Sequence, residues 1–310
     1  MKMNEAENWI RQQLILMYDE REATSIASMV MENVTGLTRI DRLTKKDEPL
    51  VVQQLHHLTE VVQRLGQHEP IQYVLGECFF HGLKLYVNNH VLIPRPETEE
   101  LVEWIINDVK TSGKNVFQRK EGEADETTQL KLLDVGTGSG CIALALKKAM
   151  PKAEVWGCDV SDEALNVARR NGAQLDIRVD FQGINFLDEL QQRSLPTVDI
   201  IVSNPPYVPE KDKATIRPNV LAHEPHTALF VPDDDALIFY KTLALFGHKR
   251  LYENGCIYIE ISENAAKETV RIFKEAGYNN VEIKKDMQGK DRMIKAHLKA
   301  HPDLPGKKAI

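Results

Sequence analysis

The fold of this chain is decided by the stretch Leu130-Lys131-Leu132-Leu133-Asp134-Val135-Gly136-Thr137-Gly138-Ser139-Gly140. An apolar run of strand length ends there in three glycines at alternate positions, and an apolar, helix-like segment over residues 141–150 follows directly. Glycines allow the backbone to turn sharply and to approach a ligand closely. A strand, a glycine loop and a helix in this order are typical of a nucleotide-type binding site.

Strand-like and helix-like segments alternate around this loop. The predicted strands cover residues 130–135, 153–160, 177–183, 198–203, 256–261, 281–284 and 293–297, and the predicted helices cover 141–150, 163–174, 236–252 and 265–276. Short connections between alternating strands and helices indicate a mostly parallel sheet with helices on both faces, which is a Rossmann-like α/β fold. Residues 111–129 contain almost no apolar side chains, so they are predicted to form a solvated loop within this domain.

The first 72 residues have a different pattern. Apolar residues recur there at helical spacing in three segments, of which the second and third are predicted to end at Gly36 and Gly66. Between residues 73 and 94 the pattern changes to alternation, with turn signals at His81-Gly82 and Asn88-Asn89, and predicts β-hairpins. We therefore predict a helical domain for partner recognition over residues 1–72, a β-hairpin linker over 73–94 and the α/β domain over 95–310.

The composition is that of an ordinary soluble protein. The chain has 310 residues, of which 42% are hydrophobic and 27% charged, and this length predicts two domains. No apolar run approaches the roughly 20 residues of a membrane span, and the charged N-terminus is unlike a signal peptide. The four cysteines lie far apart in apolar segments, so we expect no disulfides, no metal site and a cytoplasmic location. A net charge of −7 disfavours binding to a nucleic-acid backbone, and a monomer is the default expectation.

Asp159 follows Gly140 by 19 residues and stands at the end of the next predicted strand. At that place a carboxylate can accept hydrogen bonds from both hydroxyls of a ribose. Dinucleotide-binding proteins use the same layout, but their loop pattern is Gly-x-Gly-x-x-Gly, and this loop also lacks the Lys-Ser/Thr of a phosphate-binding P-loop. The early third glycine instead suits the methionine part of S-adenosylmethionine. Either Asn185 or Phe186, in the turn after the third strand, is predicted to contact the adenine.

The segment Asn204-Pro205-Pro206-Tyr207 follows the apolar run 198–203 and reaches the same edge of the sheet. Proline has no N–H, so the segment offers carbonyl oxygens without competing donors. Such a site suits a planar –NH2 group, because the Asn204 side-chain oxygen and a neighbouring carbonyl can accept its two hydrogens while Tyr207 stacks on its plane. The motif by itself fits a glutamine amide and the amino group of adenine equally well.

Taken together, these motifs resemble those of the HemK/PrmC-type protein-glutamine methyltransferases, and the resemblance covers nearly the whole chain. Its strongest pieces are Pro70-Ile71-Gln72-Tyr73-Val74-Leu75-Gly76, Leu92-Ile93-Pro94-Arg95-Pro96-Glu97-Thr98-Glu99, the glycine loop, Asn204 to Tyr207, Glu224-Pro225-His226-Thr227-Ala228-Leu229 and Gly289-Lys290-Asp291-Arg292. The resemblance implies a class I S-adenosylmethionine-dependent methyltransferase sheet with a small N-terminal helical bundle. It also implies methylation of the side-chain amide of the glutamine in the Gly-Gly-Gln loop of peptide chain release factors.

The resemblance also implies roles for particular residues. The cofactor, with S-adenosylhomocysteine as its product, would be bound by Gly136, Thr137, Gly138, Ser139, Gly140, Asp159, Asn185, Phe186 and Asn204. The substrate amide would be held by Asn204, by the carbonyl of Pro205 and by the neighbouring Pro206 and Tyr207. The helical domain would help to bind the release factor.

Two other functions fit parts of the pattern. The first is an amino-methyltransferase that acts on adenine or another exocyclic amine of DNA or RNA; the absence of a basic stripe and of a large target-recognition insert disfavours it. The second is a non-catalytic adaptor that binds release factors through its helical domain. An intact glycine loop together with an intact Asn204 disfavours the adaptor.

Overall fold

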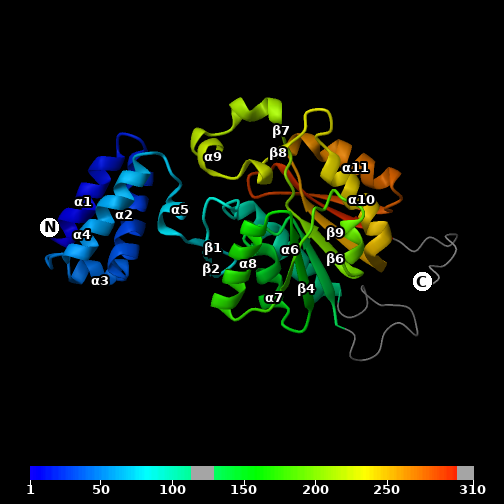
Figure 1. The fold of residues 1–310 in the computed structure, drawn as a ribbon, viewed down its shortest axis with the longest axis horizontal. Helices are drawn as coiled ribbons and strands as arrows, with labels where there is room; N and C mark the ends of the chain where they lie inside the picture. The colour runs from blue at the N-terminus through cyan, green and yellow to red at the C-terminus, as the bar shows by residue number, and fades with distance from the viewer. Residues whose placement is uncertain (113–128, 299–310) are drawn as a thin grey trace. The chain divides into compact units, whose positions relative to one another are not determined.

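The computed structural model describes residues 1–112 and 129–298, which form two compact units (Figure 1). The first unit contains Met1–Glu77, Val87–Asn89 and Arg217–His223, and the second contains the other described residues. Most of the predicted solvated loop over 111–129 lies outside the described residues. The domain boundaries at 72 and 94 stay a prediction.

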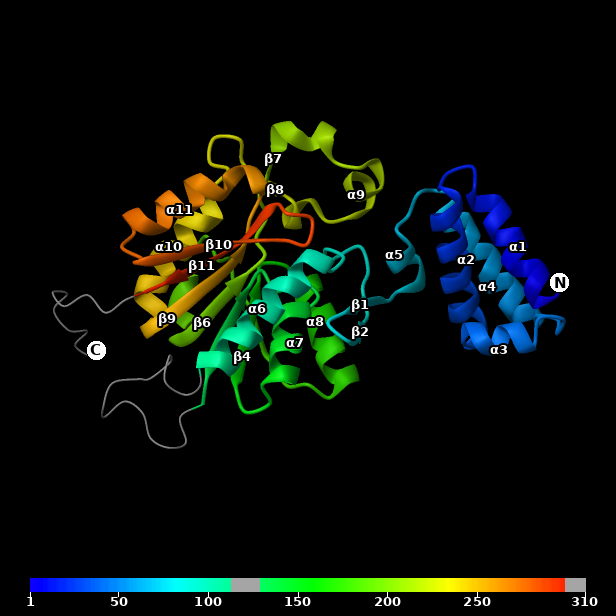
Figure 2. The same cartoon turned by 180° about the vertical axis from the view of Figure 1, so that it is seen from behind.

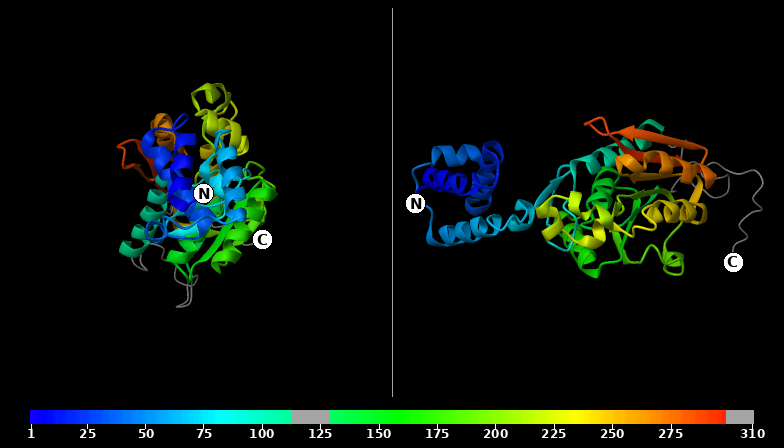
Figure 3. Two further views of the ribbon diagram at one scale, coloured as in Figure 1. Left: turned by 90° about the vertical axis from the view of Figure 1, so that its left-hand side faces the viewer. Right: turned by 90° about the horizontal axis from the view of Figure 1, so that it is seen from above.

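The first unit is helical, as the apolar spacing predicts. Its helices are α1 (Met3–Leu14), α2 (Glu20–Thr35), α3 (Arg39–Thr44), α4 (Val52–Leu65), α5 (Ile71–Leu75) and α9 (Pro218–His223). Helices α1, α2 and α4 are the blue ones in Figure 3. Helix α2 ends at Gly36, which adopts the left-handed conformation that favours glycine at a C-terminus. The sequence pattern missed α3, a short helix whose Arg42 is buried and donates hydrogen bonds to Ser28 and to the carbonyl of Leu37.

Of the predicted hairpins, one forms and one does not. Strands β1 (Cys78–Phe80) and β2 (Leu83–Leu85) pair across the His81-Gly82 turn. The second hairpin, around Asn88-Asn89, is wrong, since residues 86–95 contain no strand. The reason is that the N–H and C=O of Tyr86 are bonded by the side chain of Asn171, at 2.7 and 3.0 Å, in place of a strand partner.

The second unit is built around a seven-stranded sheet in the order β10-β11-β9-β6-β3-β4-β5. These strands are β3 (Lys131–Val135), β4 (Glu154–Asp159), β5 (Asp180–Gly183), β6 (Val198–Ser203), β9 (Leu251–Glu260), β10 (Asn280–Lys285) and β11 (Asp291–His297). Strand β11 runs antiparallel to β9 and β10, whereas the pairs from β9 to β5 are parallel. The predicted mostly parallel sheet is therefore confirmed.

Helices cover both faces of this sheet (Figures 1 and 2). On one face α6 (Pro96–Ser112), α7 (Cys141–Ala149) and α8 (Asp162–Leu175) pack against the apolar side chains of the strands. On the other face lie α10 (Ile238–Arg250) and α11 (Ala266–Glu275). Shorter elements are the pair β7 (Val208–Pro209) and β8 (Phe230–Val231) and the 3-10 turns Gln191–Ser194, Glu210–Thr215, His226–Ala228 and Glu263–Ala265. None of the helices in the described ranges has the length and apolar character needed to cross a membrane.

The chain order places a binding site at the middle of the sheet. After β3 the chain adds β4 and β5 on one side, and it then returns to add β6 on the other side of β3. In open α/β sheets such a reversal leaves a crevice outside the carboxyl ends of the strands. The loops that follow β3 and β6 are the glycine loop and the Asn204 segment.

Gly140, at the start of α7, provides a test of the local fold. Its φ is +80°, and a Cβ there would lie 3.1 Å from the Phe181 ring and 3.2 Å from Ala168 Cβ. We expect Gly140→Ala to lower the free energy of unfolding by about 2–5 kcal/mol, the sum of about 1–2 for a left-handed residue and about 1–3 for overpacking. Urea unfolding measures this loss. Gly82→Ala is the control, because Gly82 has φ +69° but open space around its Cβ position; equal losses in the two variants would contradict the packing argument.

Candidate active site

A cavity lies at the carboxyl ends of β3, β4 and β6. The space within its walls is about 800 Å³, counting space that is open to solvent. The predicted site residues that line it are Gly136, Gly138, Asp159, Asn185, Phe186, Asn204, Pro205 and Pro206. The structure thus brings together the two halves of the predicted site, one for a nucleoside and one for an –NH2 group.

Asp159 ends β4 with its carboxylate fixed in place. Its Oδ2 accepts the N–H of Gly138 at 2.9 Å and its Oδ1 accepts the N–H of Ser161 at 3.0 Å. Burial raises the pKa of Asp159, and the hydrogen bonds from these backbone groups act against that rise. A carboxylate has about four acceptor positions, so the two that remain can accept both hydroxyls of a ribose in the cavity. Ser161 itself caps α8, as its hydroxyl accepts the N–H of Ala164.

The glycine loop divides into residues that face the cavity and residues that build the loop. Gly136 and Gly138 line the cavity at positive φ, and a Cβ at either would project into open space, so bare backbone faces a ligand there. Thr137, Ser139 and Gly140 do not line it. The Thr137 hydroxyl instead donates to the buried Asp134 at 2.6 Å, whose pKa burial raises to about 7. The predicted cofactor contacts of Thr137, Ser139 and Gly140 therefore stay predictions.

Asn185 and Phe186 both line the cavity, so the adenine contact stays open between them. Phe186 is buried and packs edge-on against Phe246 with ring centroids 5.0 Å apart. Asn185 is exposed, and its side-chain oxygen accepts the N–H of Leu187 at 3.1 Å. Phe186 thus serves the core whether or not it also touches a base.

Asn204 follows β6 at the cavity wall, with Pro205 buried beside it. The side-chain Nδ2 of Asn204 donates to the hydroxyl of Thr98 at 3.1 Å, which leaves Oδ1 as an acceptor. Tyr207 does not line the cavity. Its hydroxyl lies 3.5 Å from Glu260, and its ring packs partly buried beside the apolar core. The structure thus supports an –NH2 site at Asn204, and the predicted stacking by Tyr207 stays a prediction.

Sequence reasoning missed Thr98 and Glu260, which lie behind Asn204. The Thr98 hydroxyl donates to Glu260 at 2.6 Å, and both residues are buried. Burial raises the pKa of Glu260 to about 7, while the Thr98 hydrogen bond and the charge of Arg292 act against that rise. One signal in the sequence is the acid itself, since Glu260 interrupts the apolar run 256–261.

Glu224 connects two of the motifs quoted above, the one around Arg95 and its own. It is buried, and its carboxylate accepts the N–H of Ile93 at 3.2 Å and the guanidinium of Arg95 at 2.6 Å. These bonds hold two segments together that both line the cavity, residues 90–92 on one side and Pro225, Thr227 and Ala228 on the other. The motifs around Arg95 and Glu224 therefore form one wall of the site.

The fold and this cavity define a class I S-adenosylmethionine-dependent methyltransferase. Residues 122–227 match the methyltransferase small domain, and residues 5–76 match the PrmC N-terminal domain. The chain is 42% identical over 290 residues to the release factor glutamine methyltransferase of Flavobacterium psychrophilum, covering 93% of this chain and 96% of that protein. It is 38% identical over 297 residues to the protein of the same name from Bacteroides thetaiotaomicron, covering 95% and 100%. The chain therefore belongs to the release factor glutamine methyltransferase family.

A more distant solved structure shares the fold alone. It is the hMettl16 catalytic domain in complex with MAT2A 3′UTR hairpin 6, with a TM-score of 0.52 at 14% identity over 81% of this chain and 83% of that one. Within the described ranges, no group of three or more His, Cys, Asp or Glu side chains is arranged to hold a metal ion. The family membership and the resemblance drawn from the sequence motifs agree.

Proposed function

We propose that this chain transfers a methyl group from S-adenosylmethionine to the side-chain amide nitrogen of the glutamine in the Gly-Gly-Gln motif of peptide chain release factors. The observation that carries the proposal is the position of Asn204, whose free Oδ1 and the following Pro205 share one cavity with the carboxylate of Asp159. The chain's membership of the family supports the choice of a glutamine amide.

The residues of the cavity fit S-adenosylmethionine. Asp159 offers two free acceptor positions for ribose hydroxyls, and Gly136 and Gly138 leave room for the methionine part beside bare backbone. Asn185 or Phe186 contacts the adenine at the end of β5. When bound, the cofactor supplies a methyl group on a sulfonium sulfur, and the new N–C bond forms as the S–C bond breaks, which leaves S-adenosylhomocysteine.

The protein contributes mainly by placing the substrate amide. A glutamine nitrogen is a poor nucleophile because its lone pair is delocalised into the carbonyl. In our proposal Asn204 Oδ1 and the C=O of Pro205 accept the two amide hydrogens, turn the lone pair toward the methyl group and stabilise the positive charge that develops on nitrogen. Alignment of this quality is worth about 7–11 kcal/mol, so no strong base is required. The proton is lost to water after transfer.

The remaining parts of the proposal concern partners. The helical unit binds the release factor, the chain works as a monomer in the cytoplasm, and it makes no direct contact with nucleic acid. The net charge of −7 supports the last point, because a protein that follows a nucleic-acid backbone depends on clustered Lys and Arg side chains.

A labelling experiment tests the proposed function. The purified chain is incubated with S-adenosylmethionine carrying a labelled methyl group and with three acceptors in parallel: a release factor, the same factor with the Gly-Gly-Gln glutamine changed to alanine, and nucleic acid. We expect label only on the unchanged release factor, and mass spectrometry of its Gly-Gly-Gln peptide should place one methyl group on the glutamine. Label on nucleic acid alone would reject the proposal and favour an adenine-type acceptor.

A further inference from the structure

The amide of Asn204 has two ends of nearly the same shape and opposite hydrogen-bonding character. Oδ1 accepts hydrogen bonds, whereas Nδ2 donates them. Only Oδ1 can receive a hydrogen of a substrate –NH2 group; with Nδ2 turned to the cavity, two donors would face each other. A half-turn about the last side-chain bond exchanges the two ends, so the useful orientation must be selected by whatever contacts the far side of the amide.

Thr98, on the first turn of α6, makes that contact. A hydroxyl has one hydrogen to donate, and Thr98 donates it to Glu260 Oε2 at 2.6 Å, a short bond typical of a charged acceptor. Toward Asn204 the Thr98 oxygen can therefore only accept. It receives Nδ2 at 3.1 Å, and Oδ1 is left for the cavity.

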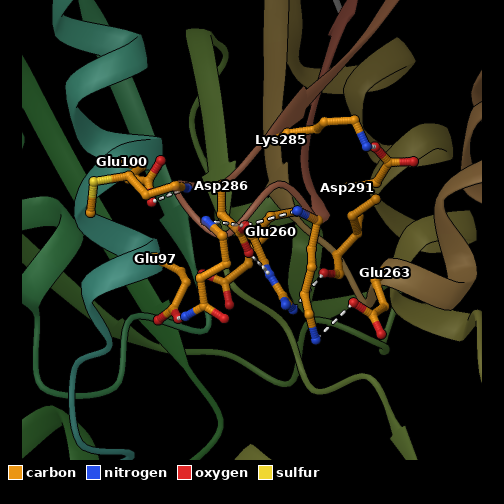
Figure 4. Close-up of polar contacts among 12 residues, drawn as sticks. Glu97, Glu100, Glu260, Glu263, Lys285, Asp286 and Asp291 are labelled. Atoms are coloured by element: carbon orange, nitrogen blue, oxygen red, sulfur yellow. Dashed lines mark hydrogen bonds and ion pairs between the residues drawn. The ribbon is translucent and has the colours of Figure 1, made fainter.

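The ionised, accepting state of Glu260, at the end of β9, is favoured by the Thr98 hydrogen bond and by the charge of Arg292, against the effect of burial. Figure 4 shows Glu260 with Asp286 in one polar cluster, where the β10–β11 turn meets the start of α6 at Glu97 and Glu100. Arg292 lies in this cluster, donates to Asp286 at 3.1 Å and attracts the carboxylate of Glu260. The Lys290 N–H and the Arg292 guanidinium lower the pKa of Asp286, so Arg292 has a charged partner of its own. The Gly289-Lys290-Asp291-Arg292 motif thus contributes Arg292, whose charge favours the ionised form of Glu260 behind Asn204.

We propose that Thr98 and Glu260 are positioning residues for methyl transfer: the carboxylate of Glu260 directs the Thr98 hydroxyl, and the Thr98 oxygen then holds the Asn204 amide with its acceptor toward the substrate. This inference rests on the proposed function. Neither residue lines the cavity, so both act through Asn204.

The test compares Thr98→Val with Thr98→Ser. Valine keeps the shape but removes the hydroxyl, whereas serine retains it. We expect Thr98→Val to lower kcat for release-factor methylation about 10- to 100-fold, somewhat less than the loss typical of a direct contact. KM for the release factor and Kd for S-adenosylmethionine should stay within about threefold, and Thr98→Ser should recover most of the rate. Thermal unfolding of both variants reports whether the fold is kept.

The pH dependence separates positioning from mere packing. The groups around Glu260 are Thr98 and Glu97 on α6, Tyr207 after β6, Tyr240 on α10 and Arg292 on β11. The pKa of Glu260 is raised to about 7, so Glu260 is ionised above that pH and protonated below it. Below pH 7 it can donate to Thr98, and the Asn204 amide is no longer directed.

The wild-type rate divided by the Thr98→Val rate should therefore rise with pH through about 7. The ratio removes the contribution of Asp134, which also has a pKa near 7 but lies under the glycine loop in both proteins. A ratio that is constant from pH 6 to 8, or a Thr98→Val variant as fast as the wild type, would overturn the inference. If Thr98→Val does not fold, Thr98→Ala replaces it, because it also removes the hydroxyl, with the same expected loss and flattened pH profile. A wild-type protein that labels no release factor would instead refute the proposed function.

Discussion

Replacing Asn204 with alanine is expected to lower the single-turnover rate of methyl transfer by at least about 100-fold, because one preorganised group at the reacting centre is typically worth 10²–10³ in rate. The variant loses the acceptor that orients the substrate nitrogen. The Kd for S-adenosylmethionine, measured by calorimetry, should change only a few-fold, since Asp159 and the glycine loop stay intact.

Asn107→Ala is the matched control. Asn107 is exposed on α6, where its side chain donates to Glu103, so its loss should leave both measurements unchanged. An Asn204→Ala variant that kept more than about a tenth of the wild-type rate would show that placement by Asn204 is not the source of catalysis.

Replacing Asp159 with alanine is expected to weaken the binding of S-adenosylmethionine by about 100-fold or more, because two charge-assisted hydrogen bonds of roughly 1.5–3 kcal/mol each are lost. Calorimetry measures this change directly. The methylation rate should recover in part when the cofactor concentration is raised, because the substrate site at Asn204 does not depend on Asp159.

Two further variants serve as controls for the Asp159→Ala result. Asp180→Ala removes an exposed carboxylate from the start of β5, where it accepts from Gln182, and should bind the cofactor like the wild type. Asp159→Asn keeps one oxygen, which can replace only one of the two carboxylate oxygens that accept from Gly138 and Ser161, so it measures how much of the loss depends on the second oxygen. Normal binding by Asp159→Ala would contradict the assignment of Asp159.

The sheet could be predicted from the sequence because its signals are local. Apolar runs of strand length alternate with amphipathic segments, and the strands and helices predicted from residue 130 onward agree with the structure apart from their ends. The second hairpin could not be predicted, since the bonds that replace it come from Asn171, which is 85 residues from Tyr86 along the chain. Nothing in the local pattern shows that a helix side chain will occupy those backbone groups.

Part of the candidate site could likewise be predicted from the sequence, and part could not. The glycine loop, Asp159 and Asn204 are recognisable because each directly follows an apolar strand, and carboxyl ends of parallel strands meet at one edge. The wall formed by Arg95 and Glu224 is not recognisable, because each half looks like an ordinary turn until the ion pair joins them.

By itself the sequence determined the α/β fold, the edge of the sheet that carries the site and the chemistry of the residues that follow β3, β4 and β6. The tertiary structure alone decided which end of the Asn204 amide faces the cavity. Thr98 and Glu260 are 162 residues apart in the chain, and the direction of their hydrogen bond exists only when α6 packs beside β9. The Asn204 side chain has a donor end and an acceptor end. The buried Thr98 behind it decides which of the two faces the cavity.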